Sequence, residues 1–289
     1  MKTLNLLGMA LGLLSLTLAL FSGATCSKGE VLKNTHKSEF GWSQERRIEG
    51  KGIVSANNRF AFDLYAHLKP TDKNIFFSPF SLSSALAMTY EGARARTAEE
   101  IRKVFHFPED KTVLRKAFLE AISEMNKEDR KYELRIANAL WPQRDYQFQS
   151  EYFRTIEQYY KGTVINQDFK VDSEKSRLTI NKWVEEKTAG KIKDLLAPGT
   201  VNSLTRLILT NAIYFKGNWE YQFDQRNTRQ ENFRVRAEKT VKVEMMSLRD
   251  KNFNYAETAE LQMLELPYEG LELSMLILLP RDNLSAIEN

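Results

Sequence analysis

The sequence predicts a single α+β domain over residues 53–289. Apolar residues at helical spacing fill most of its first half, with single strands among the helices, whereas strands dominate its last part. This order differs from the regular strand–helix alternation of a parallel α/β sheet. No linker rich in Pro, Gly or Ser divides the range, and it contains no internal repeat. One domain is therefore expected, preceded by a leader and a tether.

The first elements of this domain are two helices joined by a short strand. Apolar spacing predicts a helix that Pro70 ends, and the run 74–77 is an expected strand. Ser78 then has the position of a helix cap, where its side-chain oxygen can accept a hydrogen bond from a free backbone N–H of the first turn. Pro79 has the first helical position, where its missing N–H costs nothing because that group would have no partner in the helix. Gly92 closes this second helix.

The middle of the domain continues with helices and isolated strands. Thr97 and Glu100 have the spacing of a capping box, which predicts that a helix starts at Thr97. Helical spacing recurs at 114–125, 152–160 and 180–187, and alternation predicts strands at 132–140 and 164–169.

The strand 207–215 has two faces that are both largely apolar, which is typical of a strand in the interior of a sheet. Asn211 is the exception on its face. A buried amide needs hydrogen-bond partners, so Asn211 either belongs to a polar network in the core or meets water near a sheet edge. The strand pattern alone favours neither interpretation.

The end of the chain is unusual. Further strands are expected at 233–236, 241–245, 261–266 and 271–279. Pro280 ends the last of them, and residues 283–289 then resemble the beginning of a helix. So short a helix is not stable alone. The chain is therefore expected to stop inside an element.

Residues 1–24 are typical of a secretory signal peptide. Lys2 precedes a charge-free, Leu-rich run over 4–21, and Ser22 and Ala24 are the small residues expected before a cut after Ala24. Secretion is therefore the expected localisation. An uncleaved membrane anchor is the alternative, because the run is long enough to span a bilayer.

Cys26 is the only cysteine, so no intramolecular disulfide is expected. Its place just after the leader raises a second hypothesis, lipid attachment as in bacterial lipoproteins, which would anchor the protein at the outer membrane surface or the cell surface. Thr25 argues against this, since Gly, Ala or Ser is usual there. Residues 25–52 are polar and charged with scattered Gly, and we predict that they form a flexible tether.

Composition and motifs argue against several function classes. The formal net charge of +4 is small for 289 residues and gives no argument for nucleic-acid binding. A Ser-His-Asp triad would have to use His67 or His106, and neither lies in a hydrolase motif. No zinc, calcium or phosphate-loop spacing occurs. We therefore expect that the protein is not an enzyme, that it has no catalytic residues, and that it binds no metal or cofactor. Two basic groups are expected to be solvated faces rather than a polyanion site: Arg94, Arg96, Arg102 and Lys103, and Arg234, Arg236, Lys239 and Lys242.

Several stretches together resemble the serpin family of serine protease inhibitors. They are 74–101, 138–141 (NALW), 207–219 (LILTNAIYFKGNW), 266–270 (LPYEG) and 275–280 (MLILLP). The likeness runs from about residue 55 to the end of the chain, with the elements in the family order. It is specific, because no single short motif carries it.

The resemblance implies the serpin fold, with a large central β-sheet, two smaller sheets and surrounding helices. It also implies a one-shot trap, in which a target serine protease, or a cysteine protease, cleaves an exposed reactive loop. The loop then inserts as a new strand into the central sheet and drags the acylated protease along. The strain of the native state drives this change.

The same resemblance assigns mechanical roles to four residues. Ser78, Ser81 and Asn211 match the polar cluster beneath the centre of the sheet, which must loosen for insertion. This favours the buried-network interpretation of Asn211. Trp219 matches the tryptophan near the top of the sheet, where insertion begins. The helix around 180–187 matches the one that lies across the sheet and must move aside.

The resemblance is incomplete at one end. The chain shows neither a hinge of small residues leading to a reactive loop nor the family's C-terminal strand pattern. We therefore expect a serpin domain that is C-terminally incomplete and, as given, inactive as an inhibitor. Strand 207–215 would then have an unpaired apolar edge, so self-association is expected. The alternative function is a non-inhibitory secreted binding or structural protein on the same scaffold.

Overall fold

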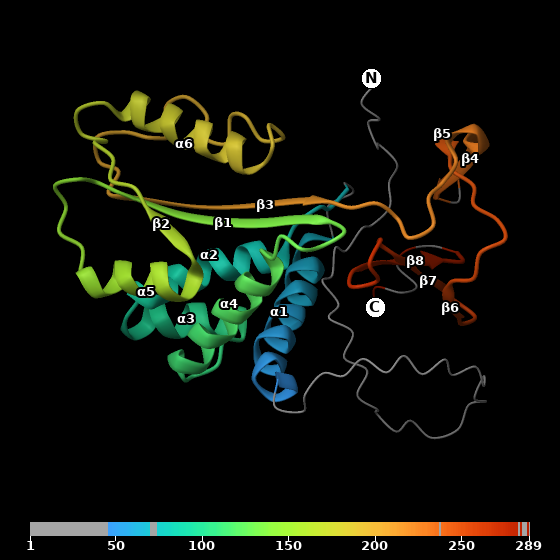
Figure 1. The fold of residues 1–289 in the computed structure, drawn as a ribbon, viewed down its shortest axis with the longest axis horizontal. Coiled ribbons are helices and arrows are strands. Elements are labelled where there is room, and N and C mark those ends of the chain that lie inside the picture. The colour runs from blue at the N-terminus through green and yellow to red at the C-terminus, as the bar shows by residue number, and fades with distance from the viewer. Residues whose placement is uncertain (1–45, 70–73, 237, 283, 285–287, 289) are drawn as a thin grey trace.

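A computed structural model describes residues 46–69, 74–236, 238–282, 284 and 288. The predicted signal peptide, Cys26 and most of the expected helix start at 283–289 lie outside these residues. The described part contains six α-helices and eight strands, arranged as an α+β fold with most helices first and most strands last (Figure 1). The predicted fold class is therefore confirmed.

The elements follow in this order: α1 (Arg46–Leu68), α2 (Pro79–Gly92), α3 (Ala95–Phe105), α4 (Lys111–Met125), β1 (Glu133–Pro142), α5 (Ser150–Tyr160), β2 (Gly162–Val164), α6 (Ser173–Lys187), β3 (Leu207–Lys216), the short 3-10 helix η1 (Gln225–Asn227), β4 (Arg229–Arg236), β5 (Lys239–Met245), β6 (Asn254–Glu257), β7 (Leu261–Pro267) and β8 (Ser274–Pro280).

The first of three sheets holds the candidate site. Its order is β2-β1-β3, with β1 parallel to β2 and antiparallel to β3. β1 and β3 pair over their whole length, from Glu133 opposite Lys216 to Pro142 opposite Leu207. Within the described part, β3 pairs with no second strand. Helices α2 and α6 contact β3 from its two faces, as its two apolar faces predict, and its outer edge is unpaired among the described strands.

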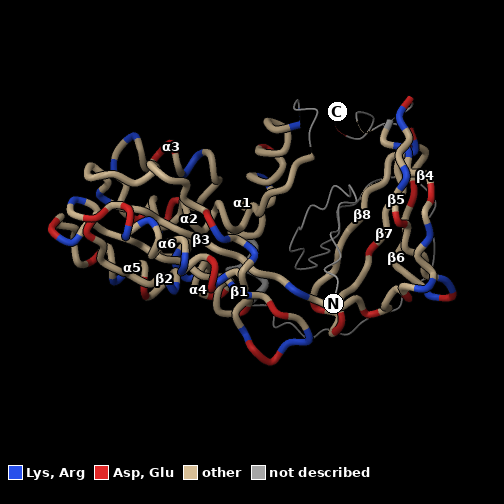
Figure 2. The backbone as a smooth tube through the Cα atoms, turned by 90° about the horizontal axis from the view of Figure 1, so that it is seen from above, with Lys and Arg blue, Asp and Glu red and all other residues tan. Residues whose placement is uncertain are grey.

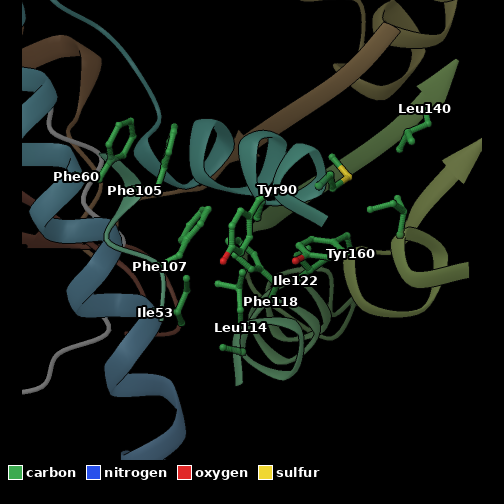
Figure 3. Close-up of a cluster of buried hydrophobic side chains, with 14 residues drawn as sticks. Ile53, Phe60, Tyr90, Phe105, Phe107, Leu114, Phe118, Ile122, Leu140 and Tyr160 are labelled. Carbon is green, nitrogen blue, oxygen red and sulfur yellow. The ribbon is translucent and has the colours of Figure 1, made fainter. Parts of the chain in front are cut away.

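Helices cover both faces of this sheet. Figure 1 shows α2, α3, α4 and α5 on one side and α6 on the other. Because side chains alternate along a strand, successive residues of β1 enter different layers. Leu140 joins a large buried cluster with Phe118 and Tyr160 (Figure 3), while Ala139 and Trp141 join a smaller cluster with α6.

The other sheets are the β4–β5 hairpin and the β6-β7-β8 meander. An isolated antiparallel bridge between Trp219 and Tyr268 connects the chain just after β3 with the end of β7. Basic and acidic residues are interspersed along these elements and along the helices (Figure 2). Of the helices that the structure describes, none combines the length and the apolar character needed to cross a membrane.

Helix α1 begins inside the predicted tether of residues 25–52. Its first residue is Arg46, so the tether prediction is wrong for residues 46–52. Gly50 and Gly52 suggested flexibility, yet each glycine costs a helix only about 1 kcal/mol relative to alanine. Ile53 and Ala56 are buried and supply tertiary packing that offsets this cost.

The predicted strand at 74–77 does not form. No described segment pairs with it, and the side chain of Phe76 is 87% exposed. An apolar run becomes a strand only where its main-chain N–H and C=O groups find a partner strand. Composition alone was therefore a misleading signal at this position.

The predicted capping box is also wrong. Helix α3 starts at Ala95, with Arg94 as its cap residue and no side-chain hydrogen bond to the cap. Thr97 is therefore already inside the first turn. The carboxylate of Glu100 instead pairs with Arg96 one turn away, at 2.7 Å from Nε to Oε1.

Several strands differ from prediction, and three of the differences have local reasons. β2 covers Gly162–Val164, so only Val164 of the predicted strand 164–169 lies in it, and the parallel register places Gly162 opposite Asn138. β6 was not predicted, because all four of its residues are exposed and leave no apolar alternation. β8 starts later than expected, because Gly270 (φ 94°) and Leu271 (φ 59°) form a left-handed turn before it.

Candidate sheet-opening site

Two asparagines lie opposite each other near the middle of β1 and β3. The antiparallel register pairs Asn138 with Asn211. Nδ2 of Asn211 donates to Oδ1 of Asn138 at 2.7 Å. The hydroxyl of Ser81, in the first turn of α2, donates to Oδ1 of Asn211. Two of the predicted residues, Ser81 and Asn211, are therefore in direct contact.

The network continues from Asn138 into the core. Its Nδ2 donates to the backbone carbonyl of Tyr160 at 2.9 Å and to Oγ of Ser84 at 3.4 Å. Asn138 is 2% exposed, and Ser84 and Tyr160 are fully buried. A buried polar group without a partner costs about 1–3 kcal/mol, so these contacts make the asparagine tolerable in the core.

The structure combines the two interpretations of Asn211, a polar network and a position near a sheet edge. Asn211 belongs to a polar network, and it is only half-buried because it lies on an edge strand of the described part.

Ser78 reaches the network indirectly. Its Oγ accepts from the backbone N–H of Ser81 at 3.2 Å and so caps α2, and Pro79 follows at the first helical position. Both features are as predicted. The cap fixes the first turn of α2, and with it the position of the Ser81 hydroxyl.

Trp219 lies in an aromatic stack just beyond the end of β3. Its ring is parallel to that of Tyr268, with centroids 4.4 Å apart, and Phe215 meets Tyr268 edge to face at 4.9 Å. A side chain at Gly217 would place its Cβ 2.9 Å from Cδ1 of Tyr268 and 3.1 Å from Cζ of Phe215. Only glycine therefore fits between these rings. Burial raises the pKa of the Tyr268 hydroxyl.

The predicted covering helix, 180–187, is the second half of α6, which lies over β1 and β3 in Figure 1. Trp183 of α6 meets Trp141 of β1 edge to face at 5.6 Å. Nε1 of Trp141 donates to Oγ1 of Thr210 at 2.9 Å. Two hydrogen bonds hold the loop after α6 against this helix. Nδ2 of Asn181 donates to the carbonyl of Leu196 at 3.0 Å, and the backbone N–H of Leu196 donates to Oδ1 of Asn181 at 2.8 Å.

Sequence reasoning missed four residues in these contacts: Ser84, Asn138, Tyr160 and Tyr268. Asn138 carried a usable signal, because it is the polar exception on the face of strand 132–140 that also carries Leu134, Ile136 and Leu140, just as Asn211 is on its face of 207–215. No sequence pattern pointed to Tyr160 or Tyr268. The carbonyl of Tyr160 meets Asn138, and the ring of Tyr268 meets Trp219, only because the fold brings distant segments together.

The two histidines of the described part lie at helix ends. His67 is in the last turn of α1, as expected, and His106 ends α3 with a left-handed backbone (φ 54°). Nε2 of His106 lies 2.6 Å from Oδ2 of Asp63. Over the described ranges, no group of three or more His, Cys, Asp or Glu side chains is placed to hold a metal ion.

The fold and the network define an α+β protein whose first sheet is held at its middle by paired side-chain amides. The chain belongs to the serpin family: the model of the family described as Serpin (serine protease inhibitor) matches residues 55–289.

Relatives and solved structures agree with this assignment. An uncharacterized serpin-like protein of Methanosarcina mazei is 44% identical over 269 residues, which cover 91% of this chain and 63% of the relative. The leukocyte elastase inhibitor of Homo sapiens is 42% identical over 233 residues, covering 80% of this chain and 61% of the relative. The structure of ovalbumin from emu (Dromaius novaehollandiae) matches with a TM-score of 0.78 and 34% identity, covering 82% of this chain and 66% of that one. The chain spans less than two thirds of the length of these two curated relatives.

Proposed function

We propose that the protein is a serpin-type inhibitor of serine proteases, in which the β2-β1-β3 sheet accepts a cleaved reactive loop as a new strand. One observation carries this proposal. The Ser81–Asn211–Asn138 network links the paired strands β1 and β3 to each other and to α2, and the outer edge of β3 is unpaired within the described part. An extended segment added there would gain main-chain hydrogen bonds along a ten-residue strand. The similarity to leukocyte elastase inhibitors supports a protease as the partner.

In this mechanism the chemistry belongs to the protease. Its serine, or the cysteine of a cysteine protease, attacks a carbonyl of the reactive loop and forms an acyl-enzyme, and the amine end of the loop leaves. Insertion of the acylated loop beside β3 then carries the protease away before water hydrolyses the acyl bond. Asn211 lies on β3 itself, so movement of this strand must break or re-form its contacts with Ser81 and Asn138.

We propose that the 289 residues alone neither inhibit a protease nor stay monomeric. No stretch of the sequence has the pattern of a reactive loop, and the apolar edge of β3 offers unpaired main-chain groups to a second copy. Sizing chromatography should therefore show assemblies larger than 33.5 kDa. A sharp monomer peak would contradict the second part of this proposal.

Inhibition is best tested on a chimera. The full chain is joined to the segment that follows the matched region in the Methanosarcina mazei relative, and is incubated with trypsin-like, chymotrypsin-like and elastase-like proteases. We expect a covalent adduct that survives SDS with at least one of them, and none with the unextended chain. A protease whose catalytic serine is replaced by alanine is the matched control and should give no adduct.

The opposite result has a clear meaning. Cleavage of the chimera by these proteases without any adduct would contradict inhibition and favour a non-inhibitory binding or structural protein.

We also propose that residues 1–24 direct secretion, with lipid attachment at Cys26 as the alternative. The charge-free run over 4–21 and the small residues before position 25 support export. N-terminal sequencing of the mature protein tests this, since a start at Thr25 is expected and an intact Met1 would contradict it.

A further inference from the structure

A buried ion pair joins α2 and α4 away from the predicted site. The side chain of Glu91, near the end of α2, is 1% exposed. Arg115 of α4 binds it with both ends of its guanidinium group: Nε lies 3.1 Å from Oε1 and Nη2 lies 2.8 Å from Oε2. A carboxylate is stable in the core only with such a paired charge and further hydrogen bonds.

Tyr160 supplies the further hydrogen bond. Its hydroxyl donates to Oε1 of Glu91 at 2.9 Å, and its ring is fully buried against Phe118 with centroids 5.3 Å apart (Figure 3). Burial, followed by the neighbouring Glu91 carboxylate, raises the pKa of this hydroxyl well above its usual range. The tyrosine therefore stays a neutral donor, and its ring has one fixed position.

The main chain of Tyr160 links the ion pair to the sheet. Tyr160 is the last residue of α5, and Lys161 then turns the chain into β2 with a left-handed backbone (φ 52°). The last carbonyls of a helix have no partner within the helix. The carbonyl of Tyr160 is thus available to accept the 2.9 Å hydrogen bond from Nδ2 of Asn138.

These contacts form a closed circuit that starts and ends on α2. It runs from Glu91 through Tyr160 to Asn138, then across the strand pair to Asn211, and back to Ser81. Residues 81 and 91 lie about 15 Å apart along the same helix. Helix α2 therefore contacts the polar cluster directly through Ser81 and Ser84, and indirectly through Glu91 and Tyr160.

We infer that Glu91, Arg115 and Tyr160 are positioning residues for the sheet-opening network. They fix the carbonyl that orients Asn138, and through Asn138 they set how firmly Asn211 is held on β3. The role in sheet opening rests on the proposed inhibitory function, whereas the coupling itself is a property of this chain. Loss of the Tyr160 hydroxyl should therefore loosen both asparagine amides without removing any atom of their mutual contact.

Two variants test this coupling in the uniformly ¹⁵N-labelled 289-residue chain. Tyr160→Phe removes one hydroxyl and leaves the ion pair intact, and Glu91→Gln removes the charge. Hydrogen exchange of the side-chain amides of Asn138 and Asn211 is measured by NMR. The indole N–H of Trp141 is the internal reference, because it donates to Oγ1 of Thr210 in the same sheet but outside the circuit.

In both variants we expect the two asparagine amides to exchange about tenfold faster, which corresponds to about 1.4 kcal/mol. The indole of Trp141 should change less than about twofold. Tyr152→Phe, which removes a hydroxyl from the same helix α5, is the matched control and should leave all three signals unchanged.

The inference is overturned if the asparagine amides of Tyr160→Phe exchange no faster, relative to Trp141, than those of the original protein. That result would make the ion pair a general stabilising feature only. Because no protease is involved, failure here is distinguishable from failure of the adduct assay on the chimera.

Discussion

Replacing Asn211 with alanine tests how strongly the network holds β1 and β3 together. The substitution removes the acceptor of the Ser81 hydroxyl and the donor to Oδ1 of Asn138. The oxygen of the buried Asn138 then lacks this partner, at a cost of about 1–3 kcal/mol. Ser81 is half-buried and water can reach it, so its lost bond costs about 0.5–1.5 kcal/mol. Together, Asn211→Ala should lower the free energy of unfolding by about 1.5–4.5 kcal/mol.

Urea denaturation followed by tryptophan fluorescence measures this loss, because Trp141 and Trp183 pack together between the sheet and α6. Asn218→Ala is the matched control. Asn218 is exposed, its Nδ2 lies 3.5 Å from Oε2 of Glu269, and its loss should cost less than about 0.5 kcal/mol. If the two variants lose the same stability, the network does not hold the strand pair and the reasoning is refuted.

Four further predictions address other parts of the molecule. Gly217→Ala should destabilise the fold by about 1–3 kcal/mol and weaken the near-UV circular dichroism of the aromatic stack, because the new methyl meets two rings; an unchanged spectrum would contradict this. Arg115→Leu should cost about 3–5 kcal/mol in urea denaturation by leaving Glu91 buried and unpaired, and leucine at both positions should recover most of the loss; no recovery would count against the ion pair. Burial raises the pKa of Tyr152 to about 12, so the folded state keeps a proton that the unfolded state loses near pH 10. The free energy of unfolding should therefore fall between about pH 10 and 12, and it should fall less steeply in Tyr152→Phe. Urea midpoints that decrease with pH equally in both proteins would disprove this. Metabolic labelling with a fatty acid should leave the protein unlabelled if the leader is cleaved after Ala24, and a label lost in Cys26→Ser would establish the lipid instead.

Elements whose cause is local could be predicted from the sequence. The Ser78 cap followed by Pro79 formed as expected, because the groups it needs lie within a few residues of each other. The Thr97 capping box has equally good spacing, yet α3 starts two residues earlier and leaves Thr97 inside the helix. A capping box is a local preference, and tertiary packing can override it. Here Glu100 pairs with Arg96 and does not cap the helix.

Features that depend on partners were predicted less well. The run 74–77 is as apolar as a strand, but within the described part no neighbour supplies its hydrogen bonds. β3 was identified from its own pattern, whereas its position at an edge depends on which other strands are present.

The candidate site shows the same division. Asn211 stood out as the only amide in an apolar strand, and the family resemblance added Ser81. Tyr160 acts through its backbone carbonyl and through a glutamate on another helix, so no local pattern could have revealed it.

Hydrogen–deuterium exchange along β3 tests the central claim most directly, namely that the sheet opens beside this strand. The full chain is measured with and without an extended peptide of about 12 alternating Thr and Ala residues, which can add to a sheet edge. We predict slower exchange of the amides over Leu207–Lys216 when the peptide is present, with little change over Glu133–Pro142, which already pairs with β3 along its whole length. Unchanged exchange in β3, or protection confined to the β6-β7-β8 sheet, would contradict the account.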